Sequence, residues 1–217
     1  FVESELWPNL ILEAHAAGVT LALVNARMSP KTISRWQAWP AAASILLSPF
    51  SWISAADART AEALTRLRDA PVATLGNLKL AAPAPNIEAA ARATLLAQIG
   101  ARPVWLAAST HAGEDEIALA AHARLRADFP DALLIIVPRH PERGADIAAL
   151  AGNAPRRSLS QPIGSASIYV ADTLGELGLF YLAAPVALVA GSMLAPLKGH
   201  NPIEPAKIGA AILAGPY

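Results

Sequence analysis

Short apolar runs alternate along the chain with longer segments in which apolar residues recur at helical spacing. The run at 133–137 is continuously apolar, which is typical of a central parallel strand covered on both faces. Because strands that alternate with helices form parallel β-α-β units, the pattern predicts an α/β fold with a doubly wound parallel sheet. The expected strands cover 20–24, 52–54, 71–74, 104–107, 133–137, 167–170, 186–189 and 211–213, and the expected helices begin at Pro8 and cover 57–67, 87–99, 114–126, 142–150, 175–182 and 202–208.

Two stretches of unusual composition bear on how the chain is organised. The stretch 81–85 is rich in Pro and Ala, so we expect a linker there and a boundary between residues 1–80 and 81–217. The uncharged stretch 177–197 is long enough to span a bilayer. Several Pro and Gly residues interrupt it, and we therefore expect a helix, a short strand and a loop instead.

The overall composition narrows the class of protein. Of the 217 residues, 54% are hydrophobic and 16% are charged, which excludes a disordered chain. Basic and acidic residues number 17 each, so no net field favours a nucleic-acid partner, and we expect none. The absence of Cys excludes disulfides and thiolate chemistry.

Polar residues gather directly after four predicted strands, at 109–114, 138–143, 172–176 and 191–192, and the last loop continues to 199–205. Ligands of open α/β sheets bind outside the carboxyl ends of the strands. Three of the five His residues lie in these loops, and four polar loops at one sheet edge favour a binding cleft. The candidate substrate-binding residues among them are Ser109, His111, His140, Ser192 and His200.

Several of these residues suit an anionic nucleotide. The planar guanidinium of Arg139 suits bidentate binding of a phosphate or carboxylate. The helices predicted after Gly113 and Gly175 would offer free amides and a partial positive charge to the same anion. Glu204, in the first turn of the last predicted helix, could accept hydrogen bonds from the two hydroxyls of a ribose.

The same loops have a structural interpretation. Asn201 with Glu204, and Thr173 with Glu176, have the N-cap and N3 spacing of a capping box. The chain also lacks both the glycine pattern of dinucleotide-binding folds and a P-loop. We do not expect a metal site at His111, His140 and His200, because their spacing matches no compact ligand motif.

The first third of the chain contains a second polar cluster. Trp7 precedes the helix expected at Pro8 and is expected to pack as a hydrophobic staple. Glu5 and Arg27 could form a structural ion pair or bind substrate. Lys79 lies near the expected domain boundary, where it could be a solvated charge or could face the cleft.

These residues together carry a resemblance to a known family. The chain resembles the 3-deoxy-D-manno-octulosonic acid (Kdo) transferases, the lipid A glycosyltransferases of Gram-negative bacteria. Seven segments in the family's order carry the resemblance from end to end: Glu3-Ser4-Glu5-Leu6-Trp7-Pro8-Asn9, Asn25-Ala26-Arg27-Met28-Ser29, Gly76-Asn77-Leu78-Lys79, Ser109-Thr110-His111-Ala112-Gly113-Glu114, Pro138-Arg139-His140-Pro141-Glu142-Arg143, Asp172-Thr173-Leu174-Gly175-Glu176-Leu177 and Gly199-His200-Asn201-Pro202-Ile203-Glu204-Pro205.

The resemblance implies a GT-B fold with two Rossmann-like doubly wound domains. Residues 1–80 would be the remainder of an incomplete acceptor-side domain, and residues 81–217 a nucleotide-sugar-binding domain truncated at its end. The implied reaction transfers Kdo, with inversion and without cofactor or metal, from CMP-Kdo to a lipid A precursor at the cytoplasmic face of the bacterial inner membrane. The implied nucleotide contacts are Pro138, Arg139, Gly175, Glu176, Leu177, Asn201, Pro202, Ile203 and Glu204.

Some positions depart from the family pattern. The catalytic base of the family, a Glu in an early glycine-containing loop, would lie upstream of Phe1, as would the segment that reaches the membrane. We therefore expect this fragment to be soluble and inactive alone. Lys198 stands where the family has Gly, close to the nucleotide. A GT-B transferase that uses a UDP-sugar and a non-catalytic nucleotide-binding fragment are the alternatives.

Overall fold

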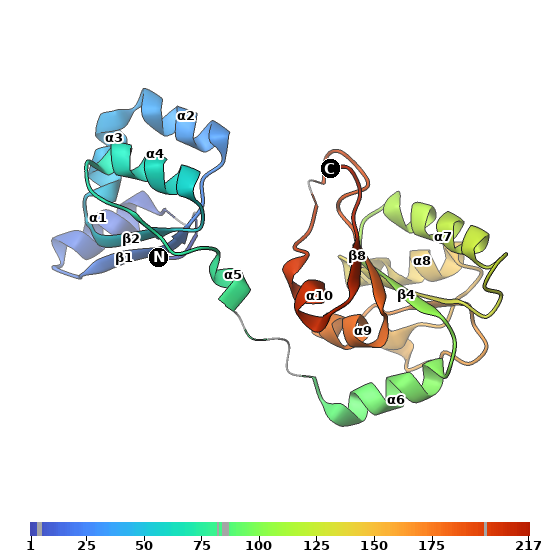
Figure 1. The fold of residues 1–217 in the computed structure, drawn as a ribbon. Coiled ribbons are helices and arrows are strands. Elements are labelled where there is room, and N and C mark those ends of the chain that lie inside the picture. The colour runs from blue at the N-terminus through green and yellow to red at the C-terminus, as the bar shows by residue number, and fades with distance from the viewer. Residues whose placement is uncertain (4–5, 82, 84–86, 198) are drawn as a thin grey trace. The chain divides into compact units, whose positions relative to one another are not determined.

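The computed structural model describes residues 1–3, 6–81, 83, 87–197 and 199–217. The chain forms two compact units, Phe1–Pro83 (unit 1) and Ala84–Tyr217 (unit 2) (Figure 1). Each unit has its own parallel sheet; unit 1 has one apolar core, and unit 2 has one on each face of its sheet.

Unit 1 contains a three-stranded parallel sheet with the strand order β1-β2-β3. Its core joins Ile11, Leu23, Phe50 and Leu64, all of which are almost completely buried. The strands are β1 (Leu21–Ala26), β2 (Phe50–Ala55) and β3 (Ala73–Thr74), and the helices are α1 (Pro8–Ala16), α2 (Pro30–Ala38), α3 (Pro40–Leu47), α4 (Ala58–Arg68) and α5 (Leu78–Ala81).

Unit 2 contains a five-stranded, wholly parallel sheet with the strand order β6-β5-β4-β7-β8. The chain starts at the central strand β4, runs out to β6, and returns to the other side of β4 with β7 and β8. This reversal makes the sheet doubly wound, as predicted. The strands are β4 (Val104–Thr110), β5 (Leu133–Pro138), β6 (Ile168–Val170), β7 (Val186–Val189) and β8 (Ala211–Leu213), and the helices are α6 (Ala89–Ile99), α7 (Glu114–Leu125), α8 (Gly144–Leu150), α9 (Leu177–Ala183) and α10 (Ile203–Ile208), with short 3₁₀ turns at Pro141–Arg143 and Arg157–Leu159.

Alternate residues of β5 enter two different cores, and every residue of this strand is buried. Leu133 and Ile135 pack in the core that includes residues of α6 and α9. Leu134 and Ile136 pack in the core that includes residues of α7 and α8. Figure 1 shows α7 and α8 on one side of β4 and α9 on the other. Coverage of both faces explains why this strand reads as an unbroken apolar run.

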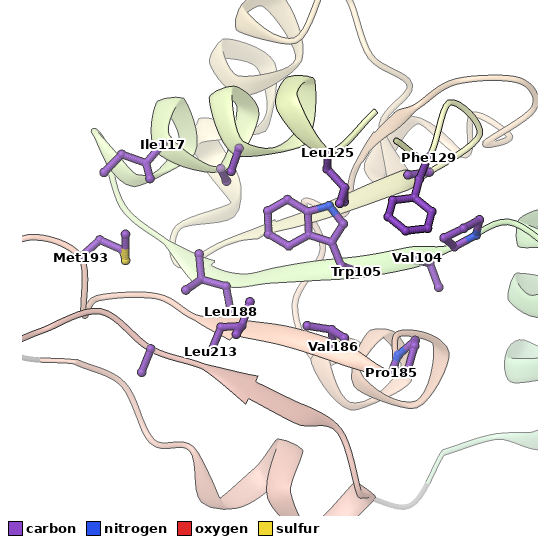
Figure 2. A pocket seen from close by; sticks show the side chains of 15 residues that line it. Val104, Trp105, Ile117, Leu125, Phe129, Pro185, Val186, Leu188, Met193 and Leu213 are labelled. Atoms are coloured by element: carbon purple, nitrogen blue, oxygen red, sulfur yellow. The ribbon is translucent and has the colours of Figure 1, made fainter. Parts of the chain in front are cut away.

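An apolar groove of about 620 Å³ lies beside α7, over the part of the sheet formed by β4, β7 and β8 (Figure 2). Trp105 projects from β4 between this helix and the sheet, and Leu188 and Leu213 extend the surface across β7 and β8. On this side of the sheet, therefore, apolar side chains line an open surface.

The uncharged stretch 177–197 forms α9, β7 and a loop, as predicted. Across the described part of the chain, no helix combines the length and the apolar character needed to cross a bilayer.

Three local predictions differ from the structure. Trp7 is 60% exposed at the N-cap of α1, so the predicted hydrophobic staple is wrong. The helix expected over 142–150 is a 3₁₀ turn followed by α8, because Pro141 starts a tighter turn before Gly144. The helix α3 is not among the predicted helices, whereas the N-cap expected at Ser29 before Pro30 is confirmed, because Ser29 caps α2 through the amide of Thr32.

We expect Ile135→Ala to lower the free energy of unfolding of unit 2 by about 2–5 kcal/mol, because it leaves a cavity between two packed layers. Ile135→Val should cost about 0.5–1.5 kcal/mol. Leu174→Ala removes a side chain that is 80% exposed and serves as the control, with a change within about 0.5 kcal/mol. Urea unfolding followed by circular dichroism measures all three, and equal losses for Ile135→Ala and Leu174→Ala would contradict the prediction.

Candidate functional site

Three histidines from separate loops meet at the carboxyl edge of the unit 2 sheet. His111 follows β4, His140 follows β5, and His200 lies in the loop between β7 and α10. The Nε2 atoms of His111 and His200 are 2.9 Å apart, and the two rings are stacked with centroids 5.1 Å apart. The His140 ring stands edge-on to His111 at a centroid distance of 5.9 Å. Three of the four polar loops predicted to share one edge, those after β4, β5 and β7, therefore contact one another. We call these residues the histidine cluster.

Arg139 contributes positive charge to the histidine cluster. Its side chain is exposed, and its backbone N–H donates to the carbonyl of Thr110 over 3.0 Å. The pKa of His200 is lowered by burial first, and then by the neighbouring His111 and Arg139. The carboxylate of Glu114 acts on this pKa in the opposite direction.

Glu114 is fully buried and joins two loops of the site. Its Oε2 accepts hydrogen bonds from the amides of His111 at 3.1 Å and Gly191 at 2.8 Å. Its Oε1 accepts a third from the amide of Met193 at 3.1 Å. One carboxylate therefore fixes the loop after β4 against the loop after β7. Sequence reasoning did not assign this role, because an acidic residue in the first turn of a helix has an ordinary electrostatic explanation.

Asp115, the next residue of α7, performs a similar task for the loop after β5. Its buried carboxylate pairs with the guanidinium of Arg143. Arg143 also donates to the carbonyl of Thr110 at 3.2 Å, the same carbonyl that accepts from the amide of Arg139. The carbonyl of Thr110 thus accepts from both the backbone of Arg139 and the side chain of Arg143, and holds the loop after β5 against β4.

The first turn of α7 corrects one prediction. We expected its amides to be free for a ligand anion, but the turn holds three carboxylates of its own, those of Glu114, Asp115 and Glu116. The amide of Gly113 donates to Glu116 over 2.9 Å. These acidic groups already compensate the positive end of the helix.

Gly191 makes the close approach of His200 possible. A Cβ at this glycine would lie 2.7 Å from Cδ2 of the imidazole, and its φ of +73° also favours glycine. The neighbouring Ser192 is buried: its hydroxyl donates to the carbonyl of Val189 and accepts from the amide of Gly215. Ser192 was a candidate for substrate binding, and the structure shows it bonded inside the protein.

The loop after β6 places Glu176 in a polar cavity. Its carboxylate accepts from Arg157 at 2.6 and 3.1 Å and from the hydroxyl of Thr173 at 2.5 Å. The bonds from Arg157 lower the pKa of Glu176. The capping box predicted for Thr173 and Glu176 is wrong. The carboxylate of Glu176 binds the Thr173 side chain, and Glu176 is itself the N-cap of α9, which begins at Leu177. The cavity, of about 440 Å³, is lined by Gln98, Arg157, Ser158, Ser160, Gln161, Tyr169, Thr173 and Glu176.

Asp172 fixes the start of the same loop. Burial alone would raise the pKa of this carboxyl, but hydrogen bonds from Ser158 and Arg156 outweigh burial and lower it. Ser158 donates through its amide at 2.9 Å and its hydroxyl at 2.8 Å, and Arg156 donates through Nε at 2.8 Å. A Cβ on Gly144 would collide with Asp172, so the tight packing here requires glycine.

The last loop differs from its predicted cap. The carboxamide of Asn201 accepts from the amide of Ile203 at 3.1 Å, and Pro202 is the N-cap of α10 without a side-chain cap bond. The capping box predicted for Asn201 and Glu204 is therefore wrong. Glu204 is half-buried. Burial of Tyr181 raises the pKa of its hydroxyl, and the negative charge of Glu204 raises it further.

The other predicted nucleotide contacts lie at the same sheet edge. Pro138 is the buried last residue of β5. Gly175 is exposed with a φ of +80°, and Leu177 packs against the core. Ser109, a candidate for substrate binding, is half-buried at a bulge of β4 and has a φ of +59° that is unusual for a residue with a side chain.

In unit 1, polar residues gather around the end of β1. Lys79 pairs with Glu3 at 2.9 Å, and the buried Asn25 accepts from the amide of Leu78 at 2.9 Å. Arg27 is exposed, and its charge contributes to the lowered pKa of Asp57, whose main cause is the amide of Thr60. Glu5 and Lys198 lie outside the described residues, so the predictions for them stay open.

The chain is similar in sequence to known proteins. Residues 1–82 match the family model described as 3-Deoxy-D-manno-octulosonic-acid transferase (kdotransferase). The chain is 36% identical over 231 residues to the probable mitochondrial 3-deoxy-D-manno-octulosonic acid transferase of Arabidopsis thaliana, with 99% of this chain and 51% of the relative covered. It is 34% identical over 225 residues to the Haemophilus influenzae 3-deoxy-D-manno-octulosonic acid transferase, with 100% and 52% covered.

A solved structure is also similar. The crystal structure of the C-terminal CMP-Kdo binding domain of WaaA from Acinetobacter baumannii matches with a TM-score of 0.52 and 36% identity, over 56% of this chain and 66% of that one. Two parallel α/β units with these similarities define a GT-B glycosyltransferase fold. The chain is similar to Kdo transferases over almost all of its length and spans about half the length of the relatives named above.

Glu114→Gln tests the junction between the two loops. A carboxamide has one acceptor oxygen and one donor group, so it must leave a buried amide facing another donor. We expect a loss of about 1–3 kcal/mol in the free energy of unfolding. The matched control is Glu116→Gln, because this exposed residue accepts a single amide bond, which a carboxamide oxygen can replace. Equal effects of the two substitutions in urea unfolding would refute the assigned role.

Asp172→Asn tests the acid dependence of stability. Because the folded-state pKa of Asp172 is lowered, its contribution is present above the unfolded pKa of about 3.9 and is lost as the pH falls through the folded value. We expect the variant to be less stable than the original chain at pH 7, with the difference shrinking towards pH 2.5. Urea unfolding at both pH values measures it, and a difference independent of pH would exclude the ion pair as its source.

Proposed function

We propose that this chain is part of an inverting GT-B glycosyltransferase that transfers Kdo from CMP-Kdo to a lipid A precursor in lipopolysaccharide biosynthesis. The observation that carries the proposal is the gathering of the predicted nucleotide residues at one sheet edge, in a chain 36% identical to a CMP-Kdo binding domain. In this proposal unit 2 binds the donor and unit 1 contributes to the acceptor side.

The residues of unit 2 have distinct roles in donor binding. The exposed guanidinium of Arg139 binds the phosphate and stabilises the charge that grows on it as CMP leaves. The carboxylate of Glu204 accepts hydrogen bonds from the ribose hydroxyls. Gly175 is exposed, and the side chain of the next residue, Glu176, is already bonded to Arg157. The contact of this loop with the nucleotide therefore comes from the main chain.

The reaction needs a base that removes the proton of the acceptor hydroxyl, which then attacks the anomeric carbon of the donor. The proposal assigns no residue of unit 2 to this step. In unit 1, the polar cluster of Glu3, Asn25 and Lys79 at the end of β1 is the candidate acceptor-side surface. A lipid A precursor is a membrane lipid, so the proposal places the intact protein at the cytoplasmic face of the bacterial inner membrane.

Calorimetric titration of the chain with CMP, UMP and UDP tests the donor class. Selective binding of CMP supports the proposal. Preferential binding of UDP would favour a transferase that uses a UDP-sugar. Absence of binding by all three would favour a chain without nucleotide function, and would overturn the proposal for unit 2.

Arg139→Ala tests the phosphate contact. Hydrogen bonds to charged groups contribute about 1.5–3 kcal/mol, so we expect the affinity for CMP to fall about tenfold or more. Arg139→Lys retains the charge but not the bidentate geometry, so its affinity for CMP should lie between those of the original chain and Arg139→Ala. Arg124→Ala removes an exposed guanidinium from the last turn of α7 and is the control. Unchanged CMP affinity in Arg139→Ala would remove Arg139 from the site.

A further inference from the structure

The contact between His111 and His200 constrains where protons can reside. With their Nε2 atoms 2.9 Å apart, one ring must donate and the other accept, because two N–H groups would collide and two lone pairs would repel. The pair therefore shares one proton along this line. It can accept a further proton only at the nitrogens that face away from the contact.

The surroundings of the pair disfavour that further proton. Burial, His111 and the guanidinium of Arg139 all lower the pKa of His200. Glu114 opposes them, but three backbone amides already share its charge. His140 adds a third imidazole, and its own near acidic neighbour is Glu142, 3.8 Å away on an exposed surface. Within the histidine cluster, His200 is therefore a basic group whose charged form is disfavoured beside a fixed cation.

An entering oxyanion would reverse this balance. A negative charge within a few ångströms of an imidazole favours its protonated form, whereas the neighbouring cation disfavours it. The cluster is open enough to receive such a group, because His111 and His200 are half-buried and His140 is exposed. Three imidazoles lie close together on three loops, and the guanidinium of Arg139 acts electrostatically on one of them.

We propose that the histidine cluster is a proton-coupled oxyanion site, which binds an anionic group of the donor and takes up a proton as it does so. The inference rests on the proposed function, since it names what this edge of the sheet recognises. The oxyanion is either the phosphate of the nucleotide or the carboxylate of its acidic sugar. If the oxyanion is the carboxylate, an uncharged sugar would gain nothing from the cluster.

The sign of the pH dependence follows from linkage. The free pKa of His200 is lowered and the bound anion raises it, so protons are taken up at pH values between the two. Affinity is therefore highest at low pH and falls as the pH rises through this window. If binding raises the pKa of His200 by about one unit, the affinity falls about tenfold as the pH rises through this window.

The test is calorimetry of the whole chain at pH 6.5 in two buffers of different ionisation enthalpy. The probes are cytidine, the methyl ester of CMP, and CMP-N-acetylneuraminate, a CMP-linked sugar acid. Neither ester has a phosphate that titrates near this pH. Uptake of up to one proton with the methyl ester identifies the phosphate as the anion, and uptake with the sugar acid alone identifies the carboxylate. Cytidine should bind without uptake.

Variants and spectroscopy provide the controls. His200→Gln should abolish the proton uptake, whereas His15→Gln, an exposed histidine of α1 in unit 1, should leave it unchanged. If His200→Gln does not fold, imidazole NMR of the original chain replaces it, and the His200 titration should move to higher pH with ligand. Binding without proton uptake overturns the inference and leaves the proposed function intact. Failure of the cytidine nucleotides to bind overturns both.

Discussion

Glu114 places a negative charge in the interior of unit 2, where an unpaired carboxylate would cost several kcal/mol. Three backbone amides compensate it, two of them from a loop that begins 77 residues further along the chain. The charge is therefore stable only when the loops after β4 and β7 are both in place. The pairing of His111 with His200 spans the same two loops and therefore depends on that junction.

The sheet topology makes this junction possible. Because the strand order reverses at β4, the central strand has β7 as its neighbour on one side and β5 on the other. The two acidic residues at the start of α7 use this position, one binding the loop after β7 and the other, through Arg143, holding the loop after β5. Gly191 then leaves room for the His200 ring, so the site is assembled from parts that are close in space and distant in sequence.

The sequence was most informative where burial determines the pattern. The unbroken apolar run of β5 and the helical spacing of α7 gave both the elements and the doubly wound order. Spacing was less informative about caps, because a Thr and a Glu three residues apart can bond to each other instead of to the backbone, as Thr173 and Glu176 do. The role of Glu114 could not be predicted, because its partners are backbone amides, which leave no mark on residue identity.

Trp105 has a consequence for observing the molecule. The chain has five Trp residues, and four of them, Trp7, Trp36, Trp39 and Trp52, belong to unit 1. Trp105 alone reports on unit 2, with its ring in the apolar groove and its indole N–H bonded to Nδ1 of the buried His122 at 3.1 Å. Replacing the other four with Phe would leave a single Trp, whose selectively excited emission follows water entry into the groove and reports on unit 2 alone.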